Sequence, residues 1–325
     1  MTTNSTIDWL GSAHAGWQAL RPSFRPVADR YLVHERRKRS SIPLWPFSQV
    51  LHTAMTLAPH DHEAHHDLPL LINTLETFRR DSAYSERPTN RRRYYDDNAW
   101  IALAELNYAD RHAGRAVATR VMGFLEQGAR AFPGDQIGIG WVEKGDTYNA
   151  CSTGSTGLAA RRLSTSVDDH MSRLANGCLN FLTRTLTDSD GLIADHRRAD
   201  GSIDAAIYTY NQGLAIGLLT ESGDIDSAKQ LAQRTIKAFD EPRLWAHPPA
   251  FNAILMRELV VLYRHDPSQA WLDFIDAYLD RVWSQARDQT TGLFTAGGIG
   301  KYDGDVILDH AALTGAFTAR GLLEI

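Results

Sequence analysis

The chain has 325 residues, of which 43% are hydrophobic and 22% are charged, and its formal net charge is -5. Acidic and basic residues are nearly balanced, so the composition gives no electrostatic sign of a nucleic-acid-binding protein. No run of about 18 apolar residues is present, which excludes a membrane-spanning helix, and two cysteines are too few for a disulfide framework.

The N-terminal segment begins Met1-Thr2-Thr3-Asn4 and has no basic stretch followed by an apolar core. We therefore expect a cytoplasmic protein, or a secreted one whose leader has been removed. No linker or low-complexity stretch interrupts residues 1–325, which we expect to form a single domain.

Two kinds of helical segment alternate along the chain. One kind starts with polar and aromatic residues and then becomes apolar on nearly every side, which is typical of buried helices. These segments start near residues 45, 97, 149, 211, 252 and 310. The other kind has a single apolar face, as in 167–182, 225–239 and 271–282. We expect Asp226 and Ser268 to cap the last two.

The buried type recurs about every 50 residues, which is the length of a helix pair with its connections. The alternation therefore predicts an all-α fold in which six helix hairpins close into a double ring, an (α/α)6 toroid. The buried helices would form the inner ring, and the amphipathic helices would form the outer ring.

The polar starts of the inner helices would meet at one end of this toroid. Helix starts carry unpaired N–H groups and a positive dipole end, which favour carboxylates and hydroxyl-rich ligands. Aromatic rings and amides suit sugars, whose C–H faces stack and whose hydroxyls form hydrogen bonds. The alternative for each residue is a helix cap or a core side chain. The candidates are Trp45, Gln49, Tyr94, Tyr95, Asp96, Asp97, Trp100, Tyr148, Asn149, Tyr210, Asn211, Gln212 and Phe251.

The sharpest feature is the pair Asp96-Asp97 at the start of an otherwise apolar helix. Neighbouring carboxylates repel each other, and partial burial would push their pKa values apart. Glycoside hydrolysis needs this division, because one carboxylate is ionised while the other carries a proton for the leaving oxygen. The alternative is that one acid caps the helix and both favour its dipole.

Two motifs resemble those of glycoside hydrolase family 76, the endo-α-1,6-mannanases. The first is Tyr94-Tyr95-Asp96-Asp97-Asn98-Ala99-Trp100-Ile101-Ala102-Leu103-Ala104, and the second is Tyr208-Thr209-Tyr210-Asn211-Gln212-Gly213. Weaker similarities lie at Lys144 with Asn149-Ala150 and at residues 251–257. The segment Gly138-Ile139-Gly140-Trp141-Val142 stands where the family often has two adjacent tryptophans, so a stacking subsite beside Trp141 would differ.

The resemblance implies a toroid that hydrolyses α-1,6-linked mannosides with retention of configuration. It implies Asp96 as the nucleophile and Asp97 as the general acid/base, with Trp141 and Lys144 among the substrate-binding residues. The partner would be a mannose-containing oligo- or polysaccharide, with no cofactor and no metal. Retention requires carboxyl groups about 5–5.5 Å apart, and neighbouring residues, with Cα atoms about 3.8 Å apart, can meet this.

Two other interpretations remain open. The first is a different sugar enzyme on the same toroid, such as a 2-epimerase or an unsaturated-uronide hydrolase. An epimerase would place histidines on inner helices as proton-transfer bases, and His310 is the clear candidate. The second is a non-catalytic glycan-binding protein that has kept both acids.

Two charged stretches have weaker interpretations. The histidine-rich segment 60–67 could bind a metal, but we expect it to be an exposed connection. The arginines 91–93 could lie on the surface, lower the pKa of a nearby acid, or admit an anionic glycan. We expect the basic run 36–39 to be a solvated helix face.

Overall fold

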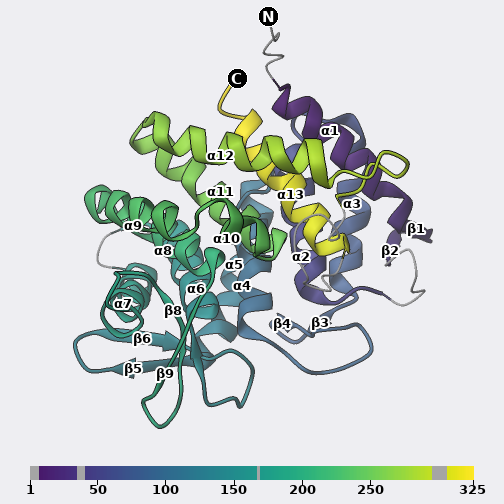
Figure 1. Ribbon diagram of the computed structural model, residues 1–325. Coiled ribbons are helices and arrows are strands. Elements are labelled where there is room, and N and C mark those ends of the chain that lie inside the picture. Colours follow the sequence, from purple (N-terminus) through teal and green to yellow (C-terminus); the bar gives the residue numbers. More distant parts are fainter. Residues whose placement is uncertain (1–6, 35–40, 167–168, 295–305) are drawn as a thin grey trace, which may run out of the picture.

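A computed structural model describes residues 7–34, 41–166, 169–294 and 306–325 (Figure 1). In this part of the chain thirteen α-helices dominate, and nine short strands form four small antiparallel sheets. The predicted all-α class is confirmed. The basic run 36–39 and Val167, the first residue of the segment 167–182, lie outside the described residues. No described helix is long and apolar enough to cross a bilayer.

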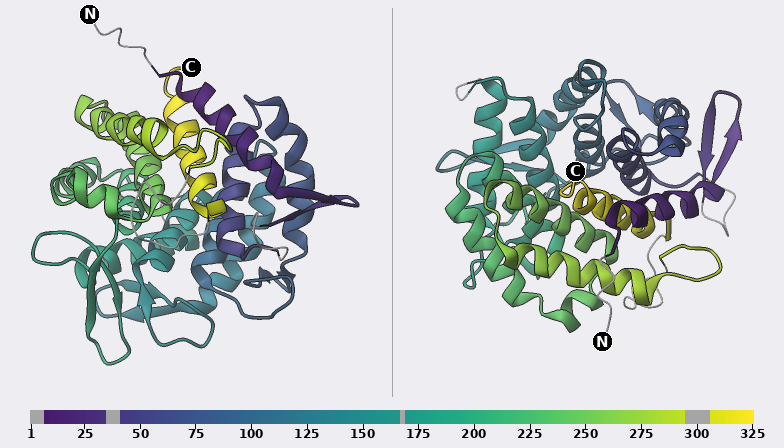
Figure 2. Two further views of the ribbon diagram at one scale, coloured as in Figure 1. Left: turned by 45° about the vertical axis from the view of Figure 1, so that its right-hand side comes forward. Right: turned by 90° about the horizontal axis from the view of Figure 1, so that it is seen from above.

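Six buried helices form an inner ring (Figure 2). Each packs against the next in chain order, and the last packs against the first, so the ring is closed. These helices are α2 (Leu44–Leu57), α4 (Tyr95–Glu105), α6 (Ala150–Leu163), α8 (Thr209–Glu221), α11 (Pro249–His265) and α13 (Val306–Gly321).

Six amphipathic helices form the outer ring. Five of them follow an inner helix and pack against it, whereas α1 packs against α13 and so completes the last pair. They are α1 (Trp9–Leu20), α3 (His62–Glu76), α5 (Arg111–Leu125), α7 (His170–Thr185), α9 (Ile225–Ala238) and α12 (Gln269–Arg281). The predicted (α/α)6 toroid is therefore confirmed. A short helix, α10 (Glu241–Ala246), precedes α11.

Short antiparallel strands lie in the connections. Three two-stranded sheets are β1 (Phe24–Val27) with β2 (Arg30–Val33), β3 (Arg79–Arg80) with β4 (Ala83–Tyr84), and β5 (Ala129–Phe132) with β6 (Gln136–Ile139). The fourth sheet has the order β7 (Tyr148–Asn149), β8 (Ala194–Arg197), β9 (Ile203–Ile207). Its pairing of Asn149 with His196 joins the start of α6 to the connection that leads into α8.

Helix starts differ between the two rings. Aspartate side chains cap five outer helices by accepting backbone N–H bonds, and these residues are Asp8, Asp61, Asp110, Asp169 and Asp224. Asp224 caps α9, so the prediction of Asp226 is wrong, and Ser268 precedes α12 without a capping bond from its side chain. The residues that precede α2, α4, α6, α8 and α11 make no side-chain capping bond either. The dipole ends of these inner helices are thus left to other partners.

The histidine-rich segment 60–67 is not a connection, because most of it forms the start of α3, but its four histidines are exposed as predicted. Asp61 caps this helix, and Asp67 is fully buried. The Asp67 carboxylate accepts hydrogen bonds from Trp17 Nε1 at 3.2 Å, Arg21 Nε at 2.8 Å and the Tyr31 hydroxyl at 2.8 Å, which tie α3 to α1 and to β2. Among the described residues no group of three or more His, Cys, Asp or Glu could hold a metal ion.

The inner ring depends on a close approach of α8 to α11. A Cβ atom on Gly213 would lie 2.8 Å from the Leu255 Cα and 3.2 Å from its backbone nitrogen. A backbone atom cannot rotate away as a side chain can, so only glycine fits this contact. Gly217, one turn later, instead faces a side chain, the carboxylate of Glu258.

We expect Gly213→Ala to lower the free energy of unfolding by about 1–3 kcal/mol, because the two helices must move apart. Gly123→Ala is the matched control, because a Cβ atom added to Gly123 in α5 would meet nothing within 4 Å. This control should raise stability by up to about 1 kcal/mol through helix propensity. Urea denaturation followed by circular dichroism measures both. Equal effects of the two substitutions would contradict the packing argument.

Candidate active site

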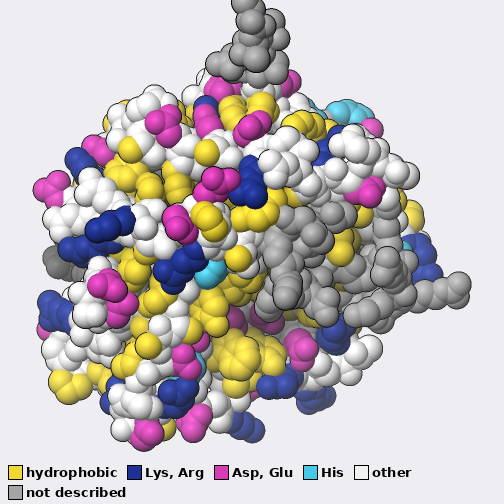
Figure 3. Space-filling model, in the orientation of Figure 1, with side chains coloured by type: hydrophobic (Ala, Val, Ile, Leu, Met, Phe, Trp, Pro, Cys, Tyr) yellow, Lys and Arg dark blue, Asp and Glu magenta, His cyan; other side chains and the backbone are white. Residues whose placement is uncertain are grey.

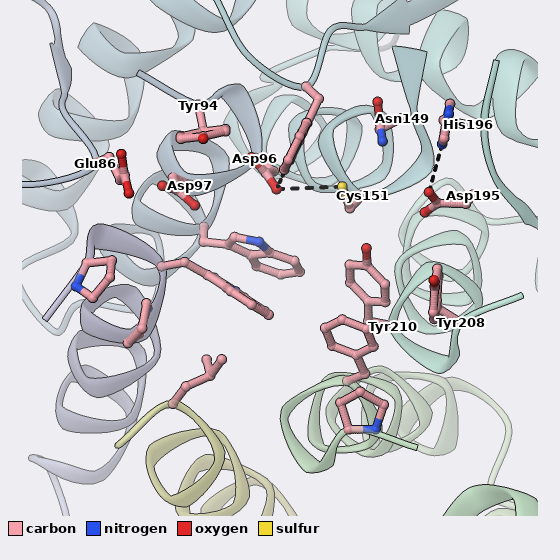
Figure 4. Close-up of a pocket in the computed structure, with 18 of the residues that line it drawn as sticks. Glu86, Tyr94, Asp96, Asp97, Asn149, Cys151, Asp195, His196, Tyr208 and Tyr210 are labelled. Carbon is pink, nitrogen blue, oxygen red and sulfur yellow. Dashed lines mark hydrogen bonds and ion pairs between the residues drawn. The ribbon is translucent and has the colours of Figure 1, made fainter. Parts of the chain in front are cut away.

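A cavity of about 910 Å³ lies where the inner helices begin. All six inner helices contribute residues from their first turns or from the residue just before them, together with connections from the outer layer (Figure 4). The lining residues are Pro43, Trp45, Pro46, Glu86, Tyr94, Asp96, Asp97, Trp100, Trp141, Thr147, Asn149, Cys151, Asp195, His196, Tyr208, Tyr210, Ala246, His247, Pro248, Phe251 and Leu308.

The structure brings most of the sequence-predicted residues together in this cavity. Nine line it, namely Trp45, Tyr94, Asp96, Asp97, Trp100, Trp141, Asn149, Tyr210 and Phe251. Tyr95 and Tyr148 are not among the lining residues. Tyr95 instead stacks on Phe124 with ring centroids 4.7 Å apart.

Four predicted substrate-binding residues lie elsewhere. Gln212 holds the backbone of Ile193 through two hydrogen bonds of 2.8 Å, and Gln49 accepts a bond of 3.0 Å from Arg257 deeper in the ring. Asn211 is buried behind the wall and donates to Asp195 at 3.3 Å. Lys144 is exposed in a turn with a φ of 65°. Gln212 and Gln49 support the scaffold, because their amides bond to buried partners, whereas Asn211 Oδ1 has no hydrogen-bond partner among the described residues.

The start of α4 is fixed by Asn98. Its side-chain oxygen accepts a bond from the Tyr84 backbone N–H at 2.8 Å, and its amide donates to the carbonyls of Tyr84 and Tyr94 at 2.9 and 2.8 Å. The Tyr95 N–H donates to the Trp141 carbonyl at 2.9 Å. These bonds hold the helix start against β4 and the 141 loop, so the side chains of Asp96 and Asp97 open into the cavity.

Asp96 is held by two side chains from other elements. Its Oδ2 accepts a hydrogen bond from Trp141 Nε1 at 3.1 Å and lies 3.7 Å from the Cys151 sulfur. Burial raises the pKa of Asp96 to about 6, while the backbone N–H of Asp97 and the Trp141 donor oppose that rise. This carboxyl is therefore ionised near neutral pH.

Asp97 has the higher proton affinity. Burial raises its pKa well above the ordinary value, and the negative charges of Asp96 and Glu86 raise the pKa further. Figure 4 shows Glu86 facing Asp97 from the connection before α4. The two neighbouring acids therefore differ in charge over the same pH range, because Asp96 has donors near it and Asp97 has carboxylates.

The arginines 91–93 do not contact the acid pair. Arg93 donates to Glu143 at 2.8 and 3.1 Å and lies over the Phe124 ring, while Arg92 lies over the Tyr94 ring. None of the three lines the cavity, and the pKa of each acid is raised rather than lowered. On the described part of the face in Figure 3, lysines and arginines are scattered among acidic side chains and form no basic patch.

The wall opposite the acid pair combines the predicted Tyr210 and Phe251 with four residues that were not predicted from the sequence, Asp195, His196, Tyr208 and His247. Asp195 and His196 come from β8, and their side chains are paired at 2.8 Å. Tyr210 stacks on Phe251 with ring centroids 4.1 Å apart, and Tyr208 and His247 complete this wall. Asp195 and His196 lie in a connection between helices, and the pairing of β8 with β7 brings them to the cavity.

His310, the predicted base of an epimerase, does not face the cavity. It is fully buried, its Nδ1 accepts a bond from the Phe294 N–H at 2.9 Å, and its Nε2 lies 2.8 Å from the Gly16 carbonyl oxygen. This histidine joins α13 to α1. The histidines of the cavity are instead His196 and His247, which precede inner helices rather than lie on them.

Residues 40–221, more than half of the chain, match glycosyl hydrolase family 76. The chain is also 28% identical over 162 residues to the meiotically up-regulated gene 191 protein of Schizosaccharomyces pombe (strain 972 / ATCC 24843). This similarity covers 42% of the present chain and 36% of the fission yeast protein, so it spans little more than a third of that relative.

Solved structures share the fold. A family 76 glycoside hydrolase from a bovine Bacteroides thetaiotaomicron strain has a TM-score of 0.85 at 19% identity, covering 98% of this chain and 79% of its own. An α-1,6-mannanase of Salegentibacter sp. HEL1_6 has a TM-score of 0.80 at 16% identity, covering 98% and 100%. That structure is an inactive variant with two consecutive aspartates replaced by alanine, in complex with α-1,6-mannotetrose. D-mannose isomerase has a TM-score of 0.72 at 11% identity, covering 100% of both chains.

We expect Asp97→Asn to raise the melting temperature at pH 7. The folded-state pKa of Asp97 is raised, so the native carboxyl opposes folding once pH exceeds its unfolded value of about 4. A neutral amide removes this cost, and for a chain of this length each kcal/mol released should raise the melting temperature by about 1–2 °C. The gain should vanish below about pH 4, where the acid is protonated in both states.

Asp169→Asn is the control of opposite sign for this measurement. Backbone N–H groups of Thr165 and Ser172 lower the pKa of Asp169, so its charge stabilises the native state above the unfolded pKa. This variant should lose stability at pH 7. Calorimetry from pH 4 to 8 tests both, and a destabilised Asp97→Asn protein at pH 7 would contradict the assignment.

Proposed function

The chain belongs to glycosyl hydrolase family 76, and we propose that it is a glycoside hydrolase that cleaves α-1,6-linked mannosides with retention of configuration. The observation that carries the proposal is the pair Asp96 and Asp97, which open into one cavity with unlike proton affinities. Retaining glycosidases need one ionised and one protonated carboxyl group at the reacting bond.

In the proposed mechanism Asp96 is the nucleophile and Asp97 is the general acid/base. The Asp96 carboxylate attacks the anomeric carbon while Asp97 gives its proton to the leaving oxygen. A covalent glycosyl-enzyme forms, and Asp97 then takes a proton from the water that releases the sugar. Glu86 supports this assignment, because its charge keeps the proton on Asp97.

The choice of substrate is supported by the walls of the cavity. Trp45, Trp100, Trp141 and the stacked pair Tyr210 and Phe251 offer ring faces for the C–H surfaces of sugars. The volume lies near the upper end of the range for sites that enclose drug-sized ligands, which suits an oligosaccharide better than a single sugar. The Salegentibacter mannanase binds α-1,6-mannotetrose on the same fold and is inactive without two consecutive aspartates.

A sugar isomerase or epimerase is the second candidate, favoured by His196 and His247 in the cavity. Such an enzyme moves a proton at carbon, for which imidazole is a suitable base. Incubation with free D-mannose followed by sugar analysis separates the two functions. Conversion of mannose without any hydrolysis of mannosides would favour the isomerase.

We expect the wild-type protein to hydrolyse α-1,6-mannooligosaccharides and Asp97→Asn to lower kcat by about 10²–10⁴-fold, because the leaving oxygen no longer receives a proton. An aryl α-mannoside with an acidic phenol needs no such proton, so its first step should persist in the variant and give a burst of phenol. Stopped-flow absorbance measures the burst, and product analysis measures cleavage of the oligosaccharide.

Azide distinguishes the roles of the two acids. With Asp97→Ala, azide should attack the glycosyl-enzyme and give the α-mannosyl azide, whereas with Asp96→Ala it should replace the nucleophile and give the β-anomer. Proton NMR identifies the anomer. The reverse pattern would exchange the two assignments, and full activity of either alanine variant would refute the mechanism.

We expect Glu86→Gln to move the basic limb of the pH profile of kcat/KM to lower pH. The limb reports loss of the proton on Asp97, and removal of the facing negative charge lowers the pKa of that carboxyl. Glu143→Gln is the control, because Glu143 is paired with Arg93 outside the cavity and should leave the limb in place. A limb that shifts equally in both variants would show that Glu86 has no specific effect.

A further inference from the structure

Cys151 lies at the start of α6 and brings a thiol into the cavity. Its sulfur is 3.7 Å from Asp96 Oδ2 and 3.9 Å from the Ser152 hydroxyl, and the residue is 3% exposed. Figure 4 shows the Tyr210 hydroxyl pointing toward it from the opposite wall. The other cysteine, Cys178, is buried in α7 and does not line the cavity.

The oxygen that the thiol approaches is the one that Trp141 also holds. Trp141 Nε1 donates to Asp96 Oδ2 at 3.1 Å, so donors from the 141 loop and from α6 converge on one carboxylate oxygen. Asp96 Oδ1 is buried and has no side-chain hydrogen-bond partner among the described residues. The orientation of the carboxylate therefore depends on these two donors and on the backbone N–H groups at the start of α4.

We propose that Cys151 is a positioning residue whose S–H donates to Asp96 Oδ2 and, together with Trp141, fixes this carboxylate and stabilises its ionised form. The catalytic part of this proposal rests on the proposed function. The contact itself does not, since it follows from the geometry alone.

The groups around the Cys151 thiol keep it protonated, so that it can donate a hydrogen bond. The ionisable groups that face it are the carboxylates of Asp96 and Asp195 and the hydroxyl of Tyr210. Burial raises the pKa of Cys151 well above its ordinary value, and both carboxylates raise the pKa further. A protonated thiol is neither a nucleophile nor a metal ligand. Because it is only a weak hydrogen-bond donor, it stabilises the Asp96 carboxylate while leaving that carboxylate nucleophilic.

A packing role is the competing explanation, since a buried cysteine behaves as a small hydrophobic residue. The two roles differ in their electrostatic coupling. If the thiol donates to Asp96, the charge of Asp96 must suppress the thiolate. Equal reactivity after replacement of Asp96 by a neutral residue of equal size would therefore exclude donation, and the response of Asp96 to a change at position 151 separates donation from space filling.

The first test measures this coupling without any enzymatic activity. Methyl methanethiosulfonate reacts with thiolates, and mass spectrometry of tryptic peptides separates Cys151 from Cys178. At pH 8 we expect faster modification of Cys151 in Asp96→Asn than in the wild type, by about tenfold for each unit by which the pKa of the thiol falls. Cys178 is the internal control and should stay unreactive in both folded proteins.

The second test uses the acidic limb of the pH profile of kcat/KM, which reports ionisation of the nucleophile in the free enzyme. Cys151→Ala removes the donor, so the limb should move to higher pH. Cys151→Ser keeps a donor and should restore the limb toward the wild-type position, which a packing role does not predict. Cys178→Ala is the matched control for loss of a buried thiol and should leave the limb unmoved.

The outcomes separate the two proposals. A wild-type protein that cleaves no mannoside refutes the proposed function, while the modification rates still decide whether Asp96 and Cys151 are coupled. Equal modification rates in the wild type and in Asp96→Asn overturn the positioning role. So does an acidic limb that stays in place in Cys151→Ala, provided that circular dichroism shows the variant to be folded.

Discussion

The site depends on one constraint, the placement of two adjacent carboxylates at a helix start that water reaches poorly. Five outer helices close their own N-termini with aspartate caps, whereas the residues that precede five inner helices provide none. The polar groups of the inner ring therefore meet at one end of the toroid. Donors near Asp96 and carboxylates near Asp97 then give two chemically identical side chains different charges.

The same constraint explains why some polar residues at the helix starts support the scaffold while others line the cavity. Asn98, Gln212 and Gln49 direct their hydrogen bonds to the backbone and to buried partners. This fixes the helix starts and leaves the aromatic rings and the acids to face the open space. Burial of Asp97 lowers the free energy of unfolding at the catalytic site. Such a cost is common at sites where the pKa of a carboxyl group is shifted for function.

The sequence was sufficient for the fold because its signal is periodic. Alternation of buried and amphipathic helices with a spacing near 50 residues reflects the toroid directly, and the starts of the buried helices identified Asp96, Asp97 and most aromatic lining residues. It was insufficient where position depends on pairing between distant segments. Asp195 and His196 reach the cavity through the β7–β8 sheet, and Glu86 through a connection. The buried amides were misassigned because a polar residue at a helix start is equally suited to a ligand and to a backbone partner.

The packing of α1 against α13 has a consequence for how the chain folds. The contact between His310 and the Gly16 carbonyl bridges 294 positions of the chain, so the two helices of this pair are far apart in the sequence. During synthesis the side of α1 that packs against α13 stays uncovered until α13 has been made. Such distant pairing slows folding and exposes the early helices to aggregation. Closure of the ring at this contact, and with it of the cavity wall at Leu308, therefore requires two segments that are far apart in the sequence.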